Sequence, residues 1–387
     1  MTGQRGAARE HTGMIMTKGR LGALATILSC AVAAPAFAAD ELTVTAEEVA
    51  ESWPYIEGTL DLSLGNDYVF SSDDPGAEIN DLFFEGALAV RFGLFEGLAI
   101  NAGVTVEPVL DADPFEDRVF GDHGLYLDTL NIEGSIGAFT ITAGKFGPGF
   151  GTAWDVTPGI YGTGFAEDYE IAEQIGFGVA YAIETASMGT HTIGANVFFA
   201  DNTVFSDSLF TSRGRTRVAD GGIGNTGRLN NFSVTLDGSD FPSVPGLAYH
   251  VGYRHLSAGI GDMADENGFV IGLVKETELA NGMVLGLNGE VAYFDNFGGT
   301  FDNALYATAG VSLASGPWHG ELAGTIRSID LAGAGSMTDQ LVQVSGGYTF
   351  ENGVDLALGY GFSRVEDIKA HVVGVRLSKS FEFSTRN

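Results

Sequence analysis

From residue 55 to residue 383 the chain is a succession of short segments in which apolar residues alternate with small or polar ones. In the stretch TLDLSLG, which begins at Thr59, every second residue is a leucine. Because neighbouring residues of a strand point to opposite faces, this period predicts strands with one apolar and one polar face. About sixteen strands are predicted. Their spans are 55–66, 80–93, 97–108, 123–136, 138–147, 174–184, 191–201, 228–239, 247–257, 268–279, 283–294, 303–314, 318–329, 339–350, 353–364 and 370–383.

The connections between these segments alternate short and long. Short connections include LFEG (94–97), GA (137–138), ANG (280–282), SGP (315–317) and ENG (351–353). The long ones are 67–79, 109–122, 148–173, 202–227, 258–267, 295–302, 330–338 and 365–369. A transmembrane barrel has this asymmetry, because its periplasmic turns are brief and its extracellular loops are longer. We therefore predict an all-β fold, an antiparallel up-and-down transmembrane barrel over 55–383, with a soluble β-sandwich as the alternative.

The net charge, glycine content and hydrophobicity of the chain exclude some classes of function and favour others. The formal net charge of −31 argues against nucleic-acid binding, because phosphates require a basic surface. The 56 glycines favour strongly twisted sheets over helices. After the leader, the sequence offers no run of about 18 apolar residues of the kind a membrane helix needs. The polar faces of the predicted strands are rich in small residues, as expected of a wall around a water-filled lumen.

The two ends of the chain read differently from its middle. Residues 1–38 are predicted to be a signal peptide with an extended start, cleaved after the small-residue pattern Ala36-Phe37-Ala38. The single cysteine, Cys30, lies within it, so no disulfide is expected in the mature chain. Residues 39–54 are predicted to be a periplasmic segment with a short helix at 46–53, and a plug that enters the barrel is the alternative. Residues 384–387 form a predicted C-terminal tail.

Motifs for catalysis and cofactors are weak. The glycine-rich GPGFG at 147–151 lacks the Lys-Ser/Thr pair and the βαβ context of a phosphate loop. The histidines show no metal-ligand spacing, and the acidic loop 111–122 lacks the pattern of a calcium loop. We expect no catalytic residues, no metal and no cofactor. A Ser-His pair of a barrel esterase or phospholipase stays open as an alternative, since many serines are present.

A cluster of carboxylates lies in the stretch 144–176, which follows the fifth predicted strand. Its carboxylates are Asp155, Glu167, Asp168, Glu170 and Glu173, of which the first four are predicted to face the channel. Its aromatic residues include Trp154, Tyr161, Phe165 and Tyr169, which are predicted to pack the loop against the wall. Alternation places four arginines on the polar faces of their strands: Arg91, Arg254, Arg327 and Arg376. A lumen position is expected for them, because an arginine facing lipid at mid-depth costs about 2–4 kcal/mol. The loop arginines 213, 215 and 217 form either a solvated surface or a ligand-recruiting patch.

These features together resemble the Gram-negative general porins: a signal peptide, about sixteen strands, a long third loop, and a last strand ending in an aromatic residue. The strand exit GKFGPGFG is similar to the corresponding stretch of phosphate-selective and related porins. The resemblance covers about 55–383 and implies a homotrimer in the outer membrane, in contact with lipid and lipopolysaccharide. It also implies a third loop that folds inward and narrows the lumen, with the four aromatic residues packing that loop.

The predicted function is a channel for passive diffusion of small hydrophilic solutes and ions. Its constriction would consist of Asp155, Glu167, Asp168 and Glu170 on the loop, facing Arg254, Arg327 and Arg376 on the wall. Opposed charges of this kind set a transverse field, and the acidic excess predicts cation preference. The alternatives are a ligand-specific channel for phosphate, sugar or a siderophore, a barrel enzyme, and a closed structural barrel.

Overall fold

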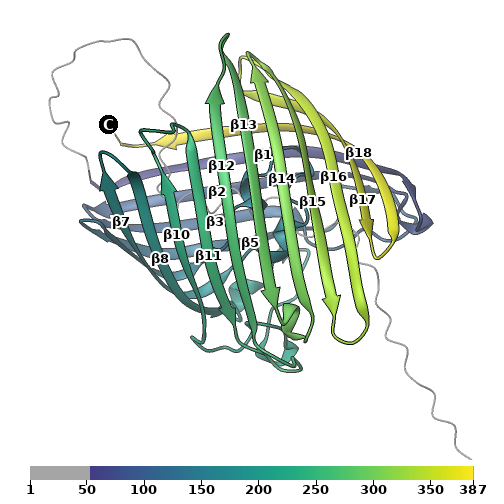
Figure 1. Cartoon of the computed structure of the whole chain (residues 1–387), viewed down its shortest axis with the longest axis horizontal. Helices are drawn as coiled ribbons and strands as arrows, with labels where there is room; N and C mark the ends of the chain where they lie inside the picture. Colours follow the sequence, from purple (N-terminus) through teal and green to yellow (C-terminus); the bar gives the residue numbers. More distant parts are fainter. Residues whose placement is uncertain (1–52, 387) are drawn as a thin grey trace, which may run out of the picture.

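The computed structural model describes residues 53–386, and its long strands close into a single antiparallel barrel (Figure 1). The barrel has sixteen strands, which confirms the predicted fold class. The strands of the barrel are β1 (Tyr55–Ser72), β2 (Asn80–Phe95), β3 (Leu98–Pro108), β5 (His123–Ile136), β6 (Phe139–Phe146), β7 (Gln174–Thr185), β8 (Gly189–Ala200), β10 (Asn231–Ser239), β11 (Leu247–Leu256), β12 (Glu266–Glu278), β13 (Met283–Asp295), β14 (Asn303–Ser315), β15 (Trp318–Leu331), β16 (Gly335–Thr349), β17 (Val354–Val365) and β18 (Ile368–Ser384). The predicted signal peptide and the helix at 46–53 fall largely outside the described residues.

The barrel closes between its first and last strands. β1 pairs with β18 over a register that runs from Glu57 opposite Ser384 to Ser72 opposite Ala370, while its other edge pairs with β2. The pairing continues past the predicted end of the barrel, because the backbone N–H of Thr385 donates to the carbonyl of Ile56 at 2.8 Å. Among residues 53–386, no helix is both long enough and apolar enough to cross a membrane.

Most predicted strands match the observed ones to within a few residues, but β1 extends six residues past its predicted end at 66 and shortens the first long connection to 73–79. The other long connections differ in two ways. Two-residue strands, β4 (Arg118–Val119) and β9 (Leu209–Phe210), pair inside long connections. The last two long connections are shorter than predicted, because β15 to β18 extend further and leave only 332–334 and 366–367 between them. Glu366 and Asp367 both adopt positive φ, 50° and 66°, the conformation that a two-residue hairpin turn requires.

The two faces of the wall differ as the alternation predicts. Outward side chains such as Ile271, Leu287 and Val344 are 45–56% exposed and form an apolar outer band. Inward side chains are polar and covered: Asn101 is 5% exposed and Asp339 is fully buried. An apolar outside around a polar inside is the arrangement of a barrel that sits in lipid.

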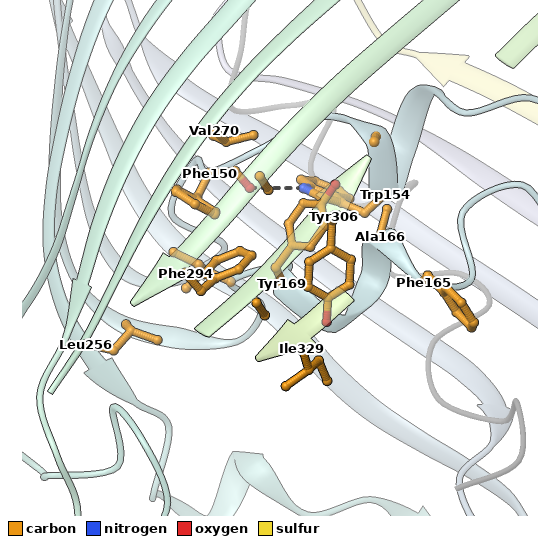
Figure 2. Close-up of a cluster of buried hydrophobic side chains, with 14 of the residues drawn as sticks. Phe150, Trp154, Phe165, Ala166, Tyr169, Leu256, Val270, Phe294, Tyr306 and Ile329 are labelled. Carbon is orange, nitrogen blue, oxygen red and sulfur yellow. Dashed lines mark hydrogen bonds between the residues drawn. The ribbon is translucent and has the colours of Figure 1, made fainter. Parts of the chain in front are cut away.

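The apolar cluster of this molecule lies inside the barrel rather than between two layers. It joins loop residues to inward-facing wall residues, and Figure 2 shows Phe150, Trp154 and Tyr169 of the loop beside Phe294 and Tyr306 of the wall. Tyr169 meets Tyr306 edge-on, with ring centroids 5.1 Å apart. The long connection between β6 and β7 is therefore packed against the inner wall.

Candidate constriction site

The connection 147–173 follows β6 and carries one helical turn, α1 (Ala153–Val156), and a 3-10 turn, η3 (Ala166–Tyr169). Prolines and glycines bend it sharply, and Gly159 adopts a φ of 96° that favours glycine. A Cβ at Gly159 would overlap the side chain of Gln343, which donates a 2.9 Å hydrogen bond to the carbonyl of Pro158. The absence of a side chain at this position lets the loop backbone approach β16.

A single buried carboxylate holds the start of α1. Glu290 of β13 is 4% exposed and accepts from the backbone N–H groups of Thr152 at 2.7 Å and Ala153 at 3.1 Å. It also accepts from the hydroxyls of Thr152 at 2.9 Å and Tyr169 at 2.6 Å. Backbone N–H groups at a helix start lack partners within the helix, so this carboxylate satisfies groups that would otherwise be unpaired. Glu290 thus ties the start of α1 and the end of η3 to the wall.

A histidine holds the neighbouring backbone. The Nε2 atom of His250 accepts from the N–H of Gly151 at 2.9 Å, and its Nδ1 atom lies 2.7 Å from Asp237. Because a backbone N–H can only donate, Nε2 is unprotonated and Nδ1–H points at the carboxylate. Further contacts join Thr157 to Asn288 at 3.0 Å.

The three wall arginines of the predicted constriction all contact the loop. Arg254 donates to the carbonyl of Tyr169 at 2.6 Å, and its guanidinium lies over Phe150 at 4.8 Å from the ring centroid. Arg327 donates to Asp168 at 2.6 Å. Arg376 lies 5.8 Å from the ring centroid of Tyr161. The alternation therefore places these arginines on the inward side, where they meet the loop directly.

Each of these arginines also pairs with a carboxylate of the wall. Their partners are Glu266 for Arg254 at 2.7 Å, Asp339 for Arg327 at 2.7 Å and Asp67 for Arg376 at 2.8 Å. Arg254 is 4% and Arg376 is 9% exposed. The predicted arrangement has the loop carboxylates facing these arginines, and the structure adds a wall carboxylate beside each arginine. The ion pairs compensate their charge and the loop covers them.

The predicted aromatic side chains of the loop are all buried, at 1–7% exposure: Trp154, Tyr161, Phe165 and Tyr169. The indole N–H of Trp154 donates to the carbonyl of Phe150 at 3.1 Å, and the hydroxyl of Tyr161 donates to Asp67 at 2.8 Å. Tyr169 has its pKa raised above its ordinary range, first by burial and then by the charge of Glu290. Each polar group of these rings therefore has a partner while its carbon atoms pack on the wall.

The loop carboxylates divide into two pairs. Asp168 binds Arg327 and accepts from the hydroxyl of Tyr306 at 3.0 Å, and Glu167 accepts from Thr163 at 2.5 Å. By contrast, the described residues place no hydrogen-bond donor on the carboxylates of Asp155 and Glu170. Asp155 is exposed and Glu170 is half-buried.

Confinement within the barrel raises the pKa of both carboxyls. Desolvation raises the pKa of Asp155 to about 6. Desolvation and then the neighbouring charge of Asp155 raise the pKa of Glu170 to about 7, with further contributions from Glu173, Glu107 and Asp128. Glu107 lies on β3 and Asp128 on β5, so the free side of the loop faces an acidic part of the wall. Carboxylates therefore lie on both sides of this part of the lumen.

Other cations of the barrel interior are also engaged. Arg91 pairs with Glu133 at 2.8 Å, and Lys145 binds Glu173 at 2.7 Å and Asp201 at 2.8 Å. In the loop between β8 and β10, Arg213 pairs with Glu173 at 2.6 Å. Arg215 donates to the carbonyl of Asn202, and the backbone of Arg217 bonds Asp220. Of the three loop arginines, Arg213 is thus paired with a carboxylate, whereas the bonds of Arg215 and Arg217 leave the charge of their guanidinium groups uncompensated.

Sequence reasoning missed the anchors of the loop, above all Glu290, His250 and the carboxylate partners of the arginines. Each of these residues occupies an inward position of its strand, and the alternating pattern of the sequence predicts that position. Nothing in the sequence distinguishes the inward carboxylates that bind the loop from those that face water.

No protein-family model matches the chain, and a search of curated proteins finds no match. Solved structures do match. OprB of Pseudomonas putida is 14% identical over 85% of this chain and 94% of its own, with a TM-score of 0.60. The outer-membrane channel DcaP of Acinetobacter baumannii is 12% identical over 84% and 96%, with a TM-score of 0.53. The trimer form of the Vibrio cholerae outer-membrane protein OmpT is 12% identical over 84% and 99%, with a TM-score of 0.50. The chain therefore has the sixteen-stranded barrel fold of outer-membrane porins, with no subfamily placed.

Proposed function

We propose that this protein forms a water-filled channel in the outer membrane of a Gram-negative bacterium, through which small hydrophilic solutes and ions diffuse. The loop 147–173 is its constriction, and cations pass in preference to anions. The apolar outer band and the barrel fold support the location. Assembly as a homotrimer, in contact with lipopolysaccharide, is part of the proposal, and the trimer form of OmpT supports it by analogy alone.

One observation carries the cation preference. The carboxylates of Asp155 and Glu170 have no described donor, whereas Arg254, Arg327 and Arg376 are each paired with a carboxylate. Side-chain charges at a narrow point set which ions enter, and paired charges contribute little field. The selectivity of the channel is therefore assigned to Asp155 and Glu170, with Glu167 and Asp168 holding the loop.

Planar-bilayer recordings under a potassium chloride gradient test this assignment. The reversal potential should have the sign of a cation-preferring channel, and the double variant Asp155→Asn/Glu170→Gln should move it toward zero. The matched control, Asp113→Asn/Glu116→Gln, removes the same charge from the exposed residues of the loop 109–122 and should leave it unchanged. Anion preference in the unmodified protein would contradict the proposal.

The ligand-specific channel is the second candidate, but its recognition elements were the loop arginines, and Arg213 is engaged with Glu173. A solute that blocks the ion current at micromolar concentration would favour it. Assays on the same purified protein distinguish a channel from a barrel enzyme. We expect the protein to conduct ions and to hydrolyse neither esters nor phospholipids.

A further inference from the structure

The outer face of the barrel carries a broad apolar hollow of about 1140 Å³ across β11 to β16, on the wall nearest the viewer in Figure 1. Its floor consists of small outward residues on three adjacent strands: Gly289, Ala307, Ala309 and Gly324. Larger outward side chains border it: Ile271, Leu273, Leu287, Leu322 and Ile326. These bordering side chains are 45–56% exposed, so the hollow opens outward.

A hollow on a lipid-facing wall has a physical consequence. Atoms that line an unfilled space lose their dispersion partners, and a gap of 0.5–1 Å already forfeits about a quarter to a half of each contact. The apolar lining excludes water as the filler, since water would find no hydrogen-bond partners there. A flexible hydrocarbon chain can fill the space.

The end of the hollow toward the short turns carries a positive charge. Lys275 lines it and lies on β12, whose following connection to β13 spans only 279–282. Its ammonium donates to the carbonyls of Glu276, at 2.9 Å, and Pro245. Carbonyl groups satisfy its protons but do not neutralise its charge, and Lys275 forms no ion pair with a described residue. By alternation, the carboxylate of Glu276 points to the opposite face.

We propose that this hollow binds a glycerophospholipid from the leaflet on the short-turn side, with its acyl chains on the glycine and alanine floor and its phosphate at Lys275. The site rests on the membrane location in the proposed function. A phosphate would supply the anionic partner that Lys275 does not have among the described residues. A second copy of the chain is a poorer partner, because the outward strand positions in the short-turn half of the described barrel carry no carboxylate.

The chain offers a matched control for the charge. Lys379 of β18 also faces outward near the short-turn end, opposite Leu62 and Val354 in the neighbouring strands. Its ammonium lies 4.7 Å from the ring centroid of Phe381. It does not line the hollow. The two lysines therefore differ in the presence of a floor of small residues beside them.

The test titrates dioleoyl-phosphatidylglycerol into the detergent-purified protein and counts bound lipids by native mass spectrometry. Lys275→Gln should weaken binding about fivefold, the effect of one lysine at a membrane surface, while Lys379→Gln should not. Ala309→Leu should also weaken binding by filling the floor. Ala195→Leu, at an exposed outward position of β8, is its control.

Four results would overturn the site. An equal loss of lipid affinity in Lys275→Gln and Lys379→Gln would mean that lysines near the short turns attract anionic lipid in general. Equal binding of uncharged dioleoylglycerol would mean that no phosphate is recognised. A change in oligomer mass in Ala309→Leu with unchanged lipid binding would make the face an interface between copies. Conductance is measured separately on the same preparations. Selective lipid binding without conduction would refute the channel, and conduction without selective binding would refute the site.

Discussion

Removing the charge of Glu290 should release the constriction while the barrel stays closed. The carboxylate accepts four hydrogen bonds from loop groups, two of them from backbone N–H groups at the start of α1. Glutamine occupies the same volume but has one acceptor oxygen, and its amide nitrogen would face donors. Glu290→Gln is therefore a local change, because the backbone pairing of β13 with β12 and β14 does not involve this side chain.

The magnitude follows from the hydrogen bonds lost. A hydrogen bond to a charged group contributes about 1.5–3 kcal/mol, and glutamine can keep about two of the four. The docked state of the loop should lose about 3–6 kcal/mol relative to the undocked state. Since every 1.4 kcal/mol is a factor of ten, even the lower figure raises the undocked-to-docked ratio by about 150-fold.

Single-channel recording measures the outcome. Glu290→Gln should give larger open-level fluctuations and a higher mean conductance, and Tyr169→Phe, which removes one hydrogen bond, should give a smaller effect in the same direction. Glu133→Gln is the control, because Glu133 is another inward carboxylate but binds Arg91 instead of the loop. Heat-modifiable gel migration verifies that each barrel is folded. Unchanged conductance in a folded Glu290→Gln channel would refute the role of this carboxylate.

Three further outcomes are expected from the same recordings. Gly159→Ala should increase current noise, because its Cβ would overlap the side chain of Gln343 and its φ of 96° disfavours alanine; a quiet channel would contradict the tight approach. Cation preference should decline as pH falls from about 7 to below 6, because pKa values of about 7 for Glu170 and about 6 for Asp155 make both carboxyls neutral at low pH. Because these pKa values are raised in the docked loop, protonation of Asp155 and Glu170 stabilises the docked state, and current noise should not increase over this pH range. A cation preference that stays constant with pH would exclude both carboxyls as its source. Arg327→Gln should leave its two carboxylate partners without a cation and raise both noise and cation preference, and an unchanged cation preference would contradict the role of this ion pair in the constriction.

The strands were predictable from sequence because one local property, the period of two, decides both their extent and their facing. β5 begins and ends at the predicted residues, 123 and 136, and the arginines fall on the inward side. The last two loops were predicted too long, because polar and small residues around Gly335 look like loop sequence while backbone pairing between β15 and β16 continues there. Register with a neighbouring strand is not visible in either sequence alone.

The site was harder to predict because its contacts join residues far apart in the chain. The carboxylates of the loop could be recognised, but the partner of Asp168 is Arg327 and the anchor of Thr152 is Glu290, more than 130 positions away. Composition showed an acidic excess without showing which charges are paired. The free carboxylates, Asp155 and Glu170, emerge only after the ion pairs of the wall have been assigned.

Because β1 pairs with β18, the barrel can close only when the chain includes its last strand. The partners in this pairing lie more than 290 positions apart, the slowest kind of contact to form, because the loop between them must close first. Until Ser384 reaches Glu57, both edge strands present unpaired backbone groups that can pair with other chains. A chain truncated before residue 368 would lack β18 and keep those edges permanently. The unfolded chain must therefore be kept from aggregating until β18, a strand of 17 residues, pairs with β1. Pairing of β18 removes both exposed edges at once.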